Sequence, residues 1–201
     1  MKKLLTLACA ALASTFLFAA SPATGVDVSL PGTTPFTLDD FEEGMYLNAI
    51  VDTWDSYGNV FKKTQFSDSQ SIKPRWDGKG NCGALHYIDL PGNKQQGCIY
   101  ECTDLIEQDW SNYGYISFVI NNPNDYPVSV QMFTKTGANW EWGNTDAPSV
   151  EPGTHTVVFK INSTAVKNTK KVLALGFAFY IEGEHPASEV YIDDITLWSK
   201  K

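Results

Sequence analysis

A succession of short β-type segments constrains the fold of this chain more than any other sequence feature. The segments are rich in β-branched and aromatic residues, and several alternate apolar with polar side chains as half-buried strands do. Turn-forming Asn, Pro and Gly residues separate them. This rhythm predicts an all-β protein, either a sandwich or a barrel. The segments are 84–90, 114–120, 127–134, 154–161, 172–181 and 189–198.

The N-terminus differs in composition from the rest of the chain. Two lysines precede an apolar stretch that ends at Ala20, and small residues follow it, so residues 1–23 are predicted to be a secretory signal peptide. A membrane anchor is the alternative, but the stretch is short for a bilayer and lacks flanking charge after it. Residues 24–36 are predicted to be a leader or linker, and 37–201 one sandwich domain. We therefore expect a secreted protein, extracellular or periplasmic, with no membrane span in the mature chain.

The charge balance limits the classes of partner. The chain has 15 basic against 23 acidic residues, a formal net charge of −8, and Arg75 is its single arginine. A nucleic-acid binder needs clustered basic side chains to neutralise phosphates, so that partner is excluded. Anionic polysaccharides are disfavoured for the same reason, and a neutral glycan fits better.

Three cysteines follow the predicted signal peptide. Cys98 and Cys102 on one extended strand would lie about 13 Å apart, too far to bridge. If 83–90 and 96–102 form a hairpin, Cys82 lies nearly opposite Cys102. We therefore predict a Cys82–Cys102 disulfide with Cys98 free.

Support for catalysis is weak. Glu141, between Trp140 and Trp142, has the setting most like that of a glycosidase acid, but no partner carboxylate is evident for it. A polysaccharide lyase would need a cation and a base, and no Arg-rich strand or suitable His element occurs. Motifs of metalloproteases, serine hydrolases and phosphate loops are also absent from the sequence. We therefore predict that the protein is not an enzyme.

Asp193 stands out in the last predicted strand. With a two-residue period, Tyr191, Asp193, Ile195 and Leu197 share one face, which is apolar except for Asp193. A carboxylate among core residues needs an ion pair or a metal, and basic partners are scarce in this chain. A Ca²⁺ ion with oxygen ligands would resolve the conflict. The alternative places Asp193 at the rim of the sheet, solvated or hydrogen-bonded to backbone.

Motifs in a fixed order along the chain resemble those of a known group. Residues 39–44 read D-D-F-E-E-G near the start, and residues 191–195 read Y-I-D-D-I near the end. Between them lie G-N-C-G-A-L at 80–85, W-S-N-Y-G-Y-I-S-F at 110–118 and N-W-E-W at 139–142. In this order they resemble calcium-containing jelly-roll carbohydrate-binding modules, especially families 11 and 27, over roughly residues 37–199. The resemblance implies the fold of these modules, a jelly-roll β-sandwich of two antiparallel sheets.

The resemblance implies a structural calcium that joins the first strand to the last. Carried over residue by residue, Glu42 and Asp193 are its best ligands, with Asp40 and Asp77 as further candidates. Tying the two ends of a sandwich together would limit fraying of the termini.

The resemblance also implies binding of a polysaccharide through aromatic stacking. Tryptophans and tyrosines in polar segments could stack on the apolar faces of sugar rings, although each could instead be buried. The candidate ligand-binding residues are Trp54, Tyr57, Trp76, Gln131, Trp140, Glu141 and Trp142. We expect a monomeric, non-catalytic binder of a neutral β-linked glucan or mannan. The alternatives are a jelly-roll lyase or hydrolase, and a structural cell-surface protein that uses the same fold without binding glycan.

Overall fold

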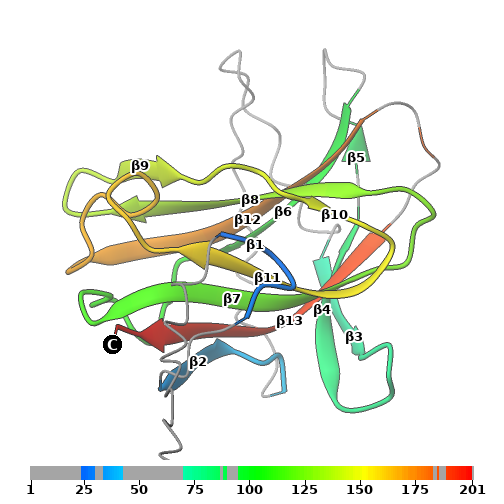
Figure 1. Ribbon diagram of the computed structural model, residues 1–201, viewed down its shortest axis with the longest axis horizontal. Helices are drawn as coiled ribbons and strands as arrows, with labels where there is room; N and C mark the ends of the chain where they lie inside the picture. The colour runs from blue at the N-terminus through cyan, green and yellow to red at the C-terminus, as the bar shows by residue number, and fades with distance from the viewer. Residues whose placement is uncertain are drawn as a thin grey trace, which may run out of the picture.

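The computed structural model describes residues 24–29, 34–42, 70–86, 88–89, 95–182, 185 and 189–200. Every regular element within these ranges is a β-strand, and the strands form two antiparallel sheets packed as a sandwich (Figure 1). The predicted all-β sandwich is therefore confirmed. None of the described segments is a helix able to cross a membrane.

The larger sheet has seven strands in the order β1-β11-β7-β13-β4-β3, and β2 also pairs with β13. Strand β13 thus joins segments from both ends of the chain, since it pairs with β2, β4 and β7. The strands are β1 (Gly25–Val26), β2 (Pro35–Asp39), β3 (Gln70–Pro74), β4 (Asn81–His86), β7 (Tyr113–Asn122), β11 (Gly153–Lys160) and β13 (Glu189–Ser199).

The smaller sheet has six strands in the order β10-β8-β12-β6-β5, and β9 pairs with β8. It forms the upper layer in Figure 1, and the seven-stranded sheet forms the lower one. The strands are β5 (Ile88–Asp89), β6 (Gln95–Cys102), β8 (Val128–Thr136), β9 (Glu141–Asn144), β10 (Ser149–Val150) and β12 (Val172–Glu182).

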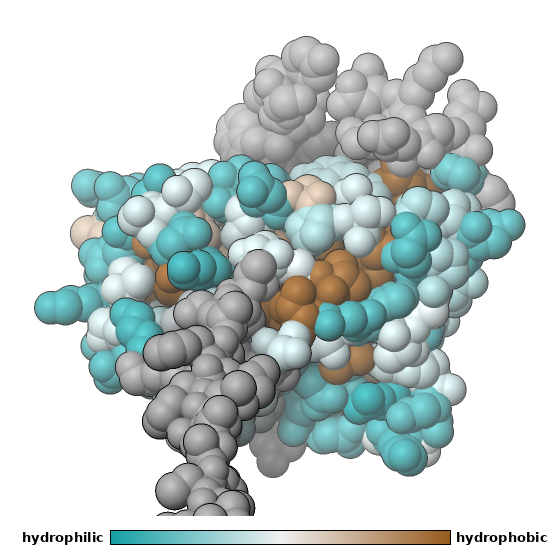
Figure 2. All heavy atoms as spheres, viewed as in Figure 1, coloured by the Kyte–Doolittle hydropathy of each residue, from teal (hydrophilic) through white to brown (hydrophobic). Residues whose placement is uncertain are grey.

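An aromatic cluster fills the space between the sheets. Phe118 of β7 and Phe177 of β12 lie with ring centroids 4.3 Å apart, and Phe159 and Phe179 pack around them. All four are fully buried, and burial of each such side chain is worth roughly 1.5–3 kcal/mol. Hydrophobic residues reach the surface mainly in a band across the middle of Figure 2, where the edges of the two layers meet. The alternation read from the sequence therefore places this core correctly.

The N-terminal boundary of the domain needs correction. Part of the stretch 24–36 belongs to the sheet, because β1 pairs with β11 and β2 begins at Pro35. Asp27 anchors this segment: its carboxylate accepts a hydrogen bond from Thr156 N at 2.8 Å and lies 2.7 Å from His155 Nδ1. The predicted signal peptide, 1–23, lies outside the described residues.

The predicted disulfide is also wrong. Cys82 lies on β4 in the seven-stranded sheet and Cys102 on β6 in the other sheet, and both are free, as is Cys98. The predicted strand 84–90 is two strands: β4 ends at His86, and β5, in the other sheet, pairs with β6. Burial raises the pKa of both Cys82 and Cys102 to about 11, so these thiols are neutral near pH 7.

Candidate functional site

The outer face of the six-stranded sheet carries an unusual set of side chains on β8. Val128, Val130 and Met132 face the core. The alternate residues Gln131, Phe133 and Lys135 therefore point away from it. Thus an aromatic ring lies between two polar side chains on this face.

The ring of Phe133 lies over Gly176 of the neighbouring strand β12. A Cβ atom at position 176 would overlap the Phe133 ring, so only glycine leaves room for it. The sheet pairs Gly176 with Phe133 directly. The missing side chain therefore allows the phenyl ring to lie flat against the sheet.

Trp142 completes an aromatic pair on this face. Strand β9 pairs Trp142 with Lys135, which places the indole on the outer side. The Trp142 ring stacks on Phe133 with centroids 4.6 Å apart and planes 9° apart. Trp142 nevertheless remains 52% exposed. One face of the Trp142 indole is thus packed on Phe133 while the residue stays open to solvent, and we call this pair the aromatic platform (Phe133 and Trp142).

An ion pair lies beside the aromatic platform. Lys135 Nζ lies 5.8 Å from the centroid of the Trp142 ring and 2.7 Å from Glu101 Oε1. Glu101 is almost fully buried, and burial raises its pKa although the hydrogen bond from Lys135 opposes the rise. The pair therefore holds the partly exposed ammonium group of Lys135 at the edge of the aromatic surface.

Sequence reasoning missed three of these residues: Phe133, Lys135 and Glu101. A signal for Phe133 and Lys135 was present, because they follow Gln131 at two-residue intervals in a strand whose alternate residues begin with the apolar Val128, Val130 and Met132. Gln131 itself was predicted, and it lies on this face with its Nε2 donating to Thr145 O at 2.8 Å.

The neighbours of Trp142 in sequence do not join the aromatic platform as predicted. Trp140 precedes β9 and lies in the turn 137–140 with a φ of 54°, so it does not share a strand face with Trp142. It is exposed to the same extent as Trp142. Glu141, adjacent to Trp142 in β9, points to the opposite side, where its carboxylate approaches Gly137. Glu141 and Gln131 therefore do not lie on one face.

Trp76 lies in a different part of the molecule. It follows β3 and packs against Tyr191 of β13, with ring centroids 6.4 Å apart, and the Arg75 guanidinium lies 4.9 Å from its ring. It thus belongs to the seven-stranded sheet and not to the aromatic platform. The predicted residues Trp54 and Tyr57 lie outside the described residues.

Asp193 is buried, as the sequence suggested, but not on the core face. Residues Asp193 to Thr196 form a bulge against β7, with Asp194 at a φ of 53°. The bulge shifts the alternation by one residue, so that Ile192 before it and Ile195 after it both face the core. Asp193 consequently points out of the sandwich, yet it is only 2% exposed.

The charge next to Asp193 is a guanidinium. Arg75 Nη1 lies 2.8 Å from Asp193 Oδ2, and it also reaches Asp194. The pKa of Asp193 is nonetheless raised to about 6. Burial is the main cause; the nearby carboxylates of Asp194 and Glu42 add to it, and Arg75 offsets only part.

Of the other predicted calcium ligands, only Asp77 contacts Arg75 among the described residues. Glu42 Oε1 accepts a hydrogen bond from Asn81 N at 2.7 Å, and Asp77 Oδ1 lies 3.4 Å from Arg75 Nε. Asp40 accepts from the backbone of Glu42 and is exposed. Among the described residues, no three acidic, His or Cys side chains converge as a metal site. Of the predicted ligands, therefore, Asp193 and Asp77 contact the Arg75 guanidinium, whereas Glu42 and Asp40 accept hydrogen bonds from backbone amides.

The buried carboxylate of β2 is Asp39, which sequence reasoning passed over in favour of Asp40. Its Oδ1 accepts from Phe41 N at 2.9 Å, and its Oδ2 accepts from the Tyr100 hydroxyl at 3.2 Å. Burial raises the pKa of Asp39. These hydrogen bonds satisfy the carboxylate without a metal.

Comparison with known proteins agrees with this architecture. Residues 53–194 match the family described as mannanase, galactose-binding domain-like. No curated protein matches the sequence. The family 11 carbohydrate-binding module of a cellulosomal cellulase of Clostridium thermocellum superposes with a TM-score of 0.51 at 15% identity, covering 85% of this chain and 97% of that one.

Two further solved structures are similar. An exo-β-agarase gives a TM-score of 0.52 at 13% identity, covering 82% of this chain and 25% of the agarase. A family 27 module of Caldicellulosiruptor saccharolyticus, solved with mannohexaose, gives 0.47 at 16% identity, covering 83% of this chain and 98% of that one.

At these identities the structural likeness shows the fold, a carbohydrate-binding-module-like sandwich, and the predicted resemblance to such modules is confirmed. The family match extends over more than half of the chain. The chain belongs to the mannanase, galactose-binding domain-like family.

Proposed function

We propose that this protein binds a neutral β-linked polysaccharide, of the glucan or mannan class, without cleaving it. The observation that carries the proposal is the aromatic platform, in which Phe133 holds the half-exposed ring of Trp142 flat. A rigid exposed indole offers a large apolar surface at little cost in conformational entropy, and exposed aromatic surface is typical of binding sites.

The polar groups beside the aromatic platform suit a sugar. The C–H face of a pyranose stacks on an aromatic ring, and its equatorial hydroxyls then need donors and acceptors at the rim. Lys135 supplies a donor and the amide of Gln131 supplies an acceptor within the same face. The net charge of −8 disfavours an anionic polymer, which leaves a neutral one.

The same face does not support hydrolysis. Glycosidases place two carboxyl groups across the scissile bond, one acting as acid and the other as nucleophile or base. Glu101 is ion-paired to Lys135, and Glu141 points to the other side of β9. The likeness to an agarase covers only a quarter of that enzyme, so agarose cleavage does not transfer to this chain.

Two further proposals come from the sequence. Residues 1–23 direct export and are removed, so the mature protein acts outside the cytoplasm. A calcium ion at Glu42 and Asp193 ties the segment after β2 to β13 and competes with Arg75 for the carboxylate of Asp193. For the calcium, EDTA should lower the melting temperature of the wild type and leave that of Asp193→Ala unchanged; an unchanged wild type would remove the site.

Affinity electrophoresis against soluble glucans and mannans tests the binding function. The wild type should be retarded without shortening of the polymer, and Trp142→Ala should lose at least tenfold in affinity, about 1.4 kcal/mol. Trp76→Ala, a tryptophan removed from the other sheet, is the matched control and should bind as the wild type does.

Each contrary outcome points to a different alternative. Equal retardation of Trp142→Ala and the wild type would exclude the aromatic platform as the binding surface. Shortening of the polymer would identify an enzyme. A lack of retardation by every glycan would favour a structural role at the cell surface.

A further inference from the structure

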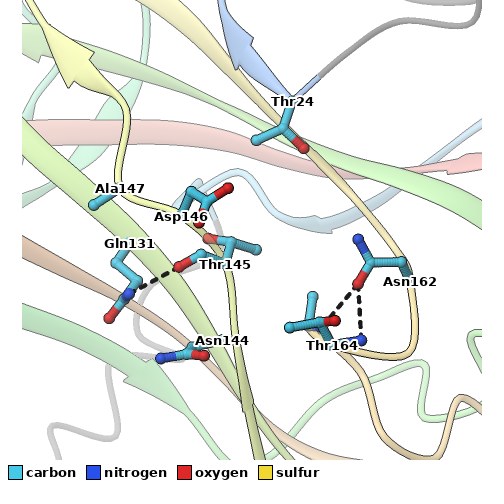
Figure 3. A pocket seen from close by; sticks show the side chains of 9 residues that line it. Thr24, Gln131, Asn144, Thr145, Asp146, Ala147, Asn162 and Thr164 are labelled. Atoms are coloured by element: carbon cyan, nitrogen blue, oxygen red, sulfur yellow. Dashed lines mark hydrogen bonds between the residues drawn. The ribbon is translucent and has the colours of Figure 1, made fainter.

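A polar cavity adjoins the aromatic platform at the edge of the sandwich. Its volume is about 480 Å³, within the range of roughly 300–1,000 Å³ usual for small-molecule sites. One wall is the end of β9, at Asn144, and its connection to β10, with Thr145 and Asp146. The opposite wall is the loop after β11, with Asn162 and Thr164 (Figure 3).

Backbone hydrogen bonds hold both walls in place. Asn162 Oδ1 accepts from Thr164 N at 2.9 Å and Ala165 N at 3.0 Å, as the dashed lines at Thr164 in Figure 3 indicate. Ala165 O in turn accepts from the buried Thr134 hydroxyl at 2.7 Å. On the other wall, Thr145 N donates to Met132 O at 3.0 Å. The cavity is therefore preorganised and loses little entropy when a ligand enters.

Several side-chain groups of the walls have unused hydrogen-bonding capacity. Within the described residues, the Asn144 amide, the Asp146 carboxylate and the Thr164 hydroxyl make no side-chain hydrogen bond. The same holds for Asn162 Nδ2, because only the Oδ1 of that amide is engaged. Donors and acceptors thus stand together around one cavity.

This lining selects for a neutral, hydroxyl-rich ligand. Among the described residues that line the cavity, none has a basic or an aromatic side chain, and Asp146 is the single charged one. An anion would find no counter-charge there, and an apolar ligand would leave amides and a carboxylate unpaired. A metal ion is disfavoured because one carboxylate does not make a ligand set. The hydroxyls of a hexose match such a mixture of donors and acceptors.

The cavity lies next to the aromatic platform along strands β8 and β9. Asn144 follows Trp142 by two residues on β9, and Gln131 precedes Phe133 by two on β8. Two residues along a strand correspond to about 7 Å, so a polymer stacked on Trp142 brings a neighbouring sugar unit to the cavity.

We propose that this cavity is a subsite for one neutral hexopyranosyl unit, read through its hydroxyls, of the polysaccharide that stacks on Trp142. The inference rests on the proposed function and deepens it. The unit is either the next residue of the main chain or a branch attached to it, and the two sources share the same chemistry.

The double variant Asn144→Ala/Thr164→Val tests the subsite. Both side chains are exposed and make no hydrogen bond among the described residues, so the fold should be retained. Affinity should fall about tenfold, because two modest hydrogen bonds to sugar hydroxyls are lost. The matched control is Asn112→Ala/Ser163→Ala, two exposed residues that are not among those lining the cavity, and it should leave affinity unchanged.

Two probes distinguish the source of the sugar unit: a galactose-substituted β-mannan and its unsubstituted counterpart. A loss with both polymers assigns the cavity to a main-chain unit, and a loss with the substituted polymer alone assigns it to a branch. If Trp142→Ala abolishes binding while the double variant binds both polymers within twofold of the wild type, the subsite is refuted and the proposed function stands.

Free hexoses give a readout that does not depend on the aromatic platform. In ¹⁵N-correlated NMR spectra, millimolar mannose, glucose or galactose should shift the side-chain amide signals of Asn144 and Asn162, in the wild type and equally in Trp142→Ala. If none of the three sugars shifts these signals, the subsite is refuted even when the wild type binds no polymer and the proposed function fails with it.

Discussion

Replacement of Arg75 by methionine should destabilise the domain by about 3 kcal/mol. The guanidinium lies 2.8 Å from the carboxylate of Asp193, whose side chain is 2% exposed. Methionine keeps much of the apolar stem of arginine and removes only its charge and donors. The variant therefore leaves a buried carboxylate without its cation, which is the costly way to break such a pair.

The magnitude follows from burial and distance. Two charges about 4 Å apart attract by about 4 kcal/mol at the effective dielectric of about 20 found near protein surfaces. Removing one partner of a fully buried pair costs about 3–5 kcal/mol. Because the Arg75 side chain is 22% exposed, water can partly replace it, and we expect the lower end of that range. For a domain of this size the melting temperature falls by roughly 6–12 °C.

Urea denaturation of the mature chain is the appropriate assay, with EDTA present so that no metal replaces the lost cation. A double-mutant cycle with Asp193→Asn isolates the pair: in that background, Arg75→Met should cost less than about 1 kcal/mol. Lys79→Met is the matched control, since Lys79 lies exposed in the same loop, and should change stability by no more than about 0.5 kcal/mol.

A loss below about 1 kcal/mol for Arg75→Met in EDTA would refute this reasoning. It would mean that Asp193 is stable without the guanidinium, through backbone hydrogen bonds or in its protonated form. An equal loss in the Asp193→Asn background would refute it differently, because Arg75 would then act through its contact with Trp76.

Three smaller predictions concern other contacts. The hydrogen bond between Asp27 and His155 raises the pKa of His155 and lowers that of Asp27. His155→Ala should therefore cost about 0.5 kcal/mol of stability between pH 3.8 and 6.5, the ordinary pKa values of the two groups, and less outside that range. Urea titrations at several pH values would detect this dependence. Gly176→Ala should displace Phe133, cost about 1–3 kcal/mol in urea and weaken glycan retardation; unchanged binding would contradict the backing role of Phe133. A thiol reagent should modify three cysteines per denatured mature chain and none in the native protein. A count of one in the denatured chain would instead show that two of the cysteines form a disulfide. The thiols are Cys82, Cys98 and Cys102.

The strands could be predicted because burial enforces their alternation. In β7, Ile116, Phe118 and Ile120 all face the core, and a shift of one residue would turn all three away from it. Such a pattern is local, so the sequence shows it directly. The assignment of strands to sheets is not local: nothing in residues 84–90 indicates that the chain changes sheets after His86. The disulfide prediction failed for this reason.

The bulge at Asp193 could not be predicted from the alternation of residues, for a related reason. A fixed two-residue period assigned Asp193 to the same face as Ile195, but the left-handed φ at Asp194 breaks the period between them. Aspartate tolerates that conformation better than most residues. Local hydrogen bonds also support it, since Asp193 Oδ1 accepts from Asp194 N and Asp194 O accepts from Thr196 Oγ1. The burial of Asp193 was thus predicted correctly, although the predicted direction of its side chain was wrong.

The aromatic platform shows how a candidate site divides between local and non-local information. That Phe133 points outward between Gln131 and Lys135 follows from alternation alone. That Trp142, and not Trp140, stacks on it depends on the turn 137–140, which sets the pairing of β9 with β8. That the phenyl ring lies flat depends on a glycine more than forty residues away in β12. A search for similar platforms should therefore combine an outward aromatic on one strand with glycine opposite it on the next, because neither feature marks the site without the other.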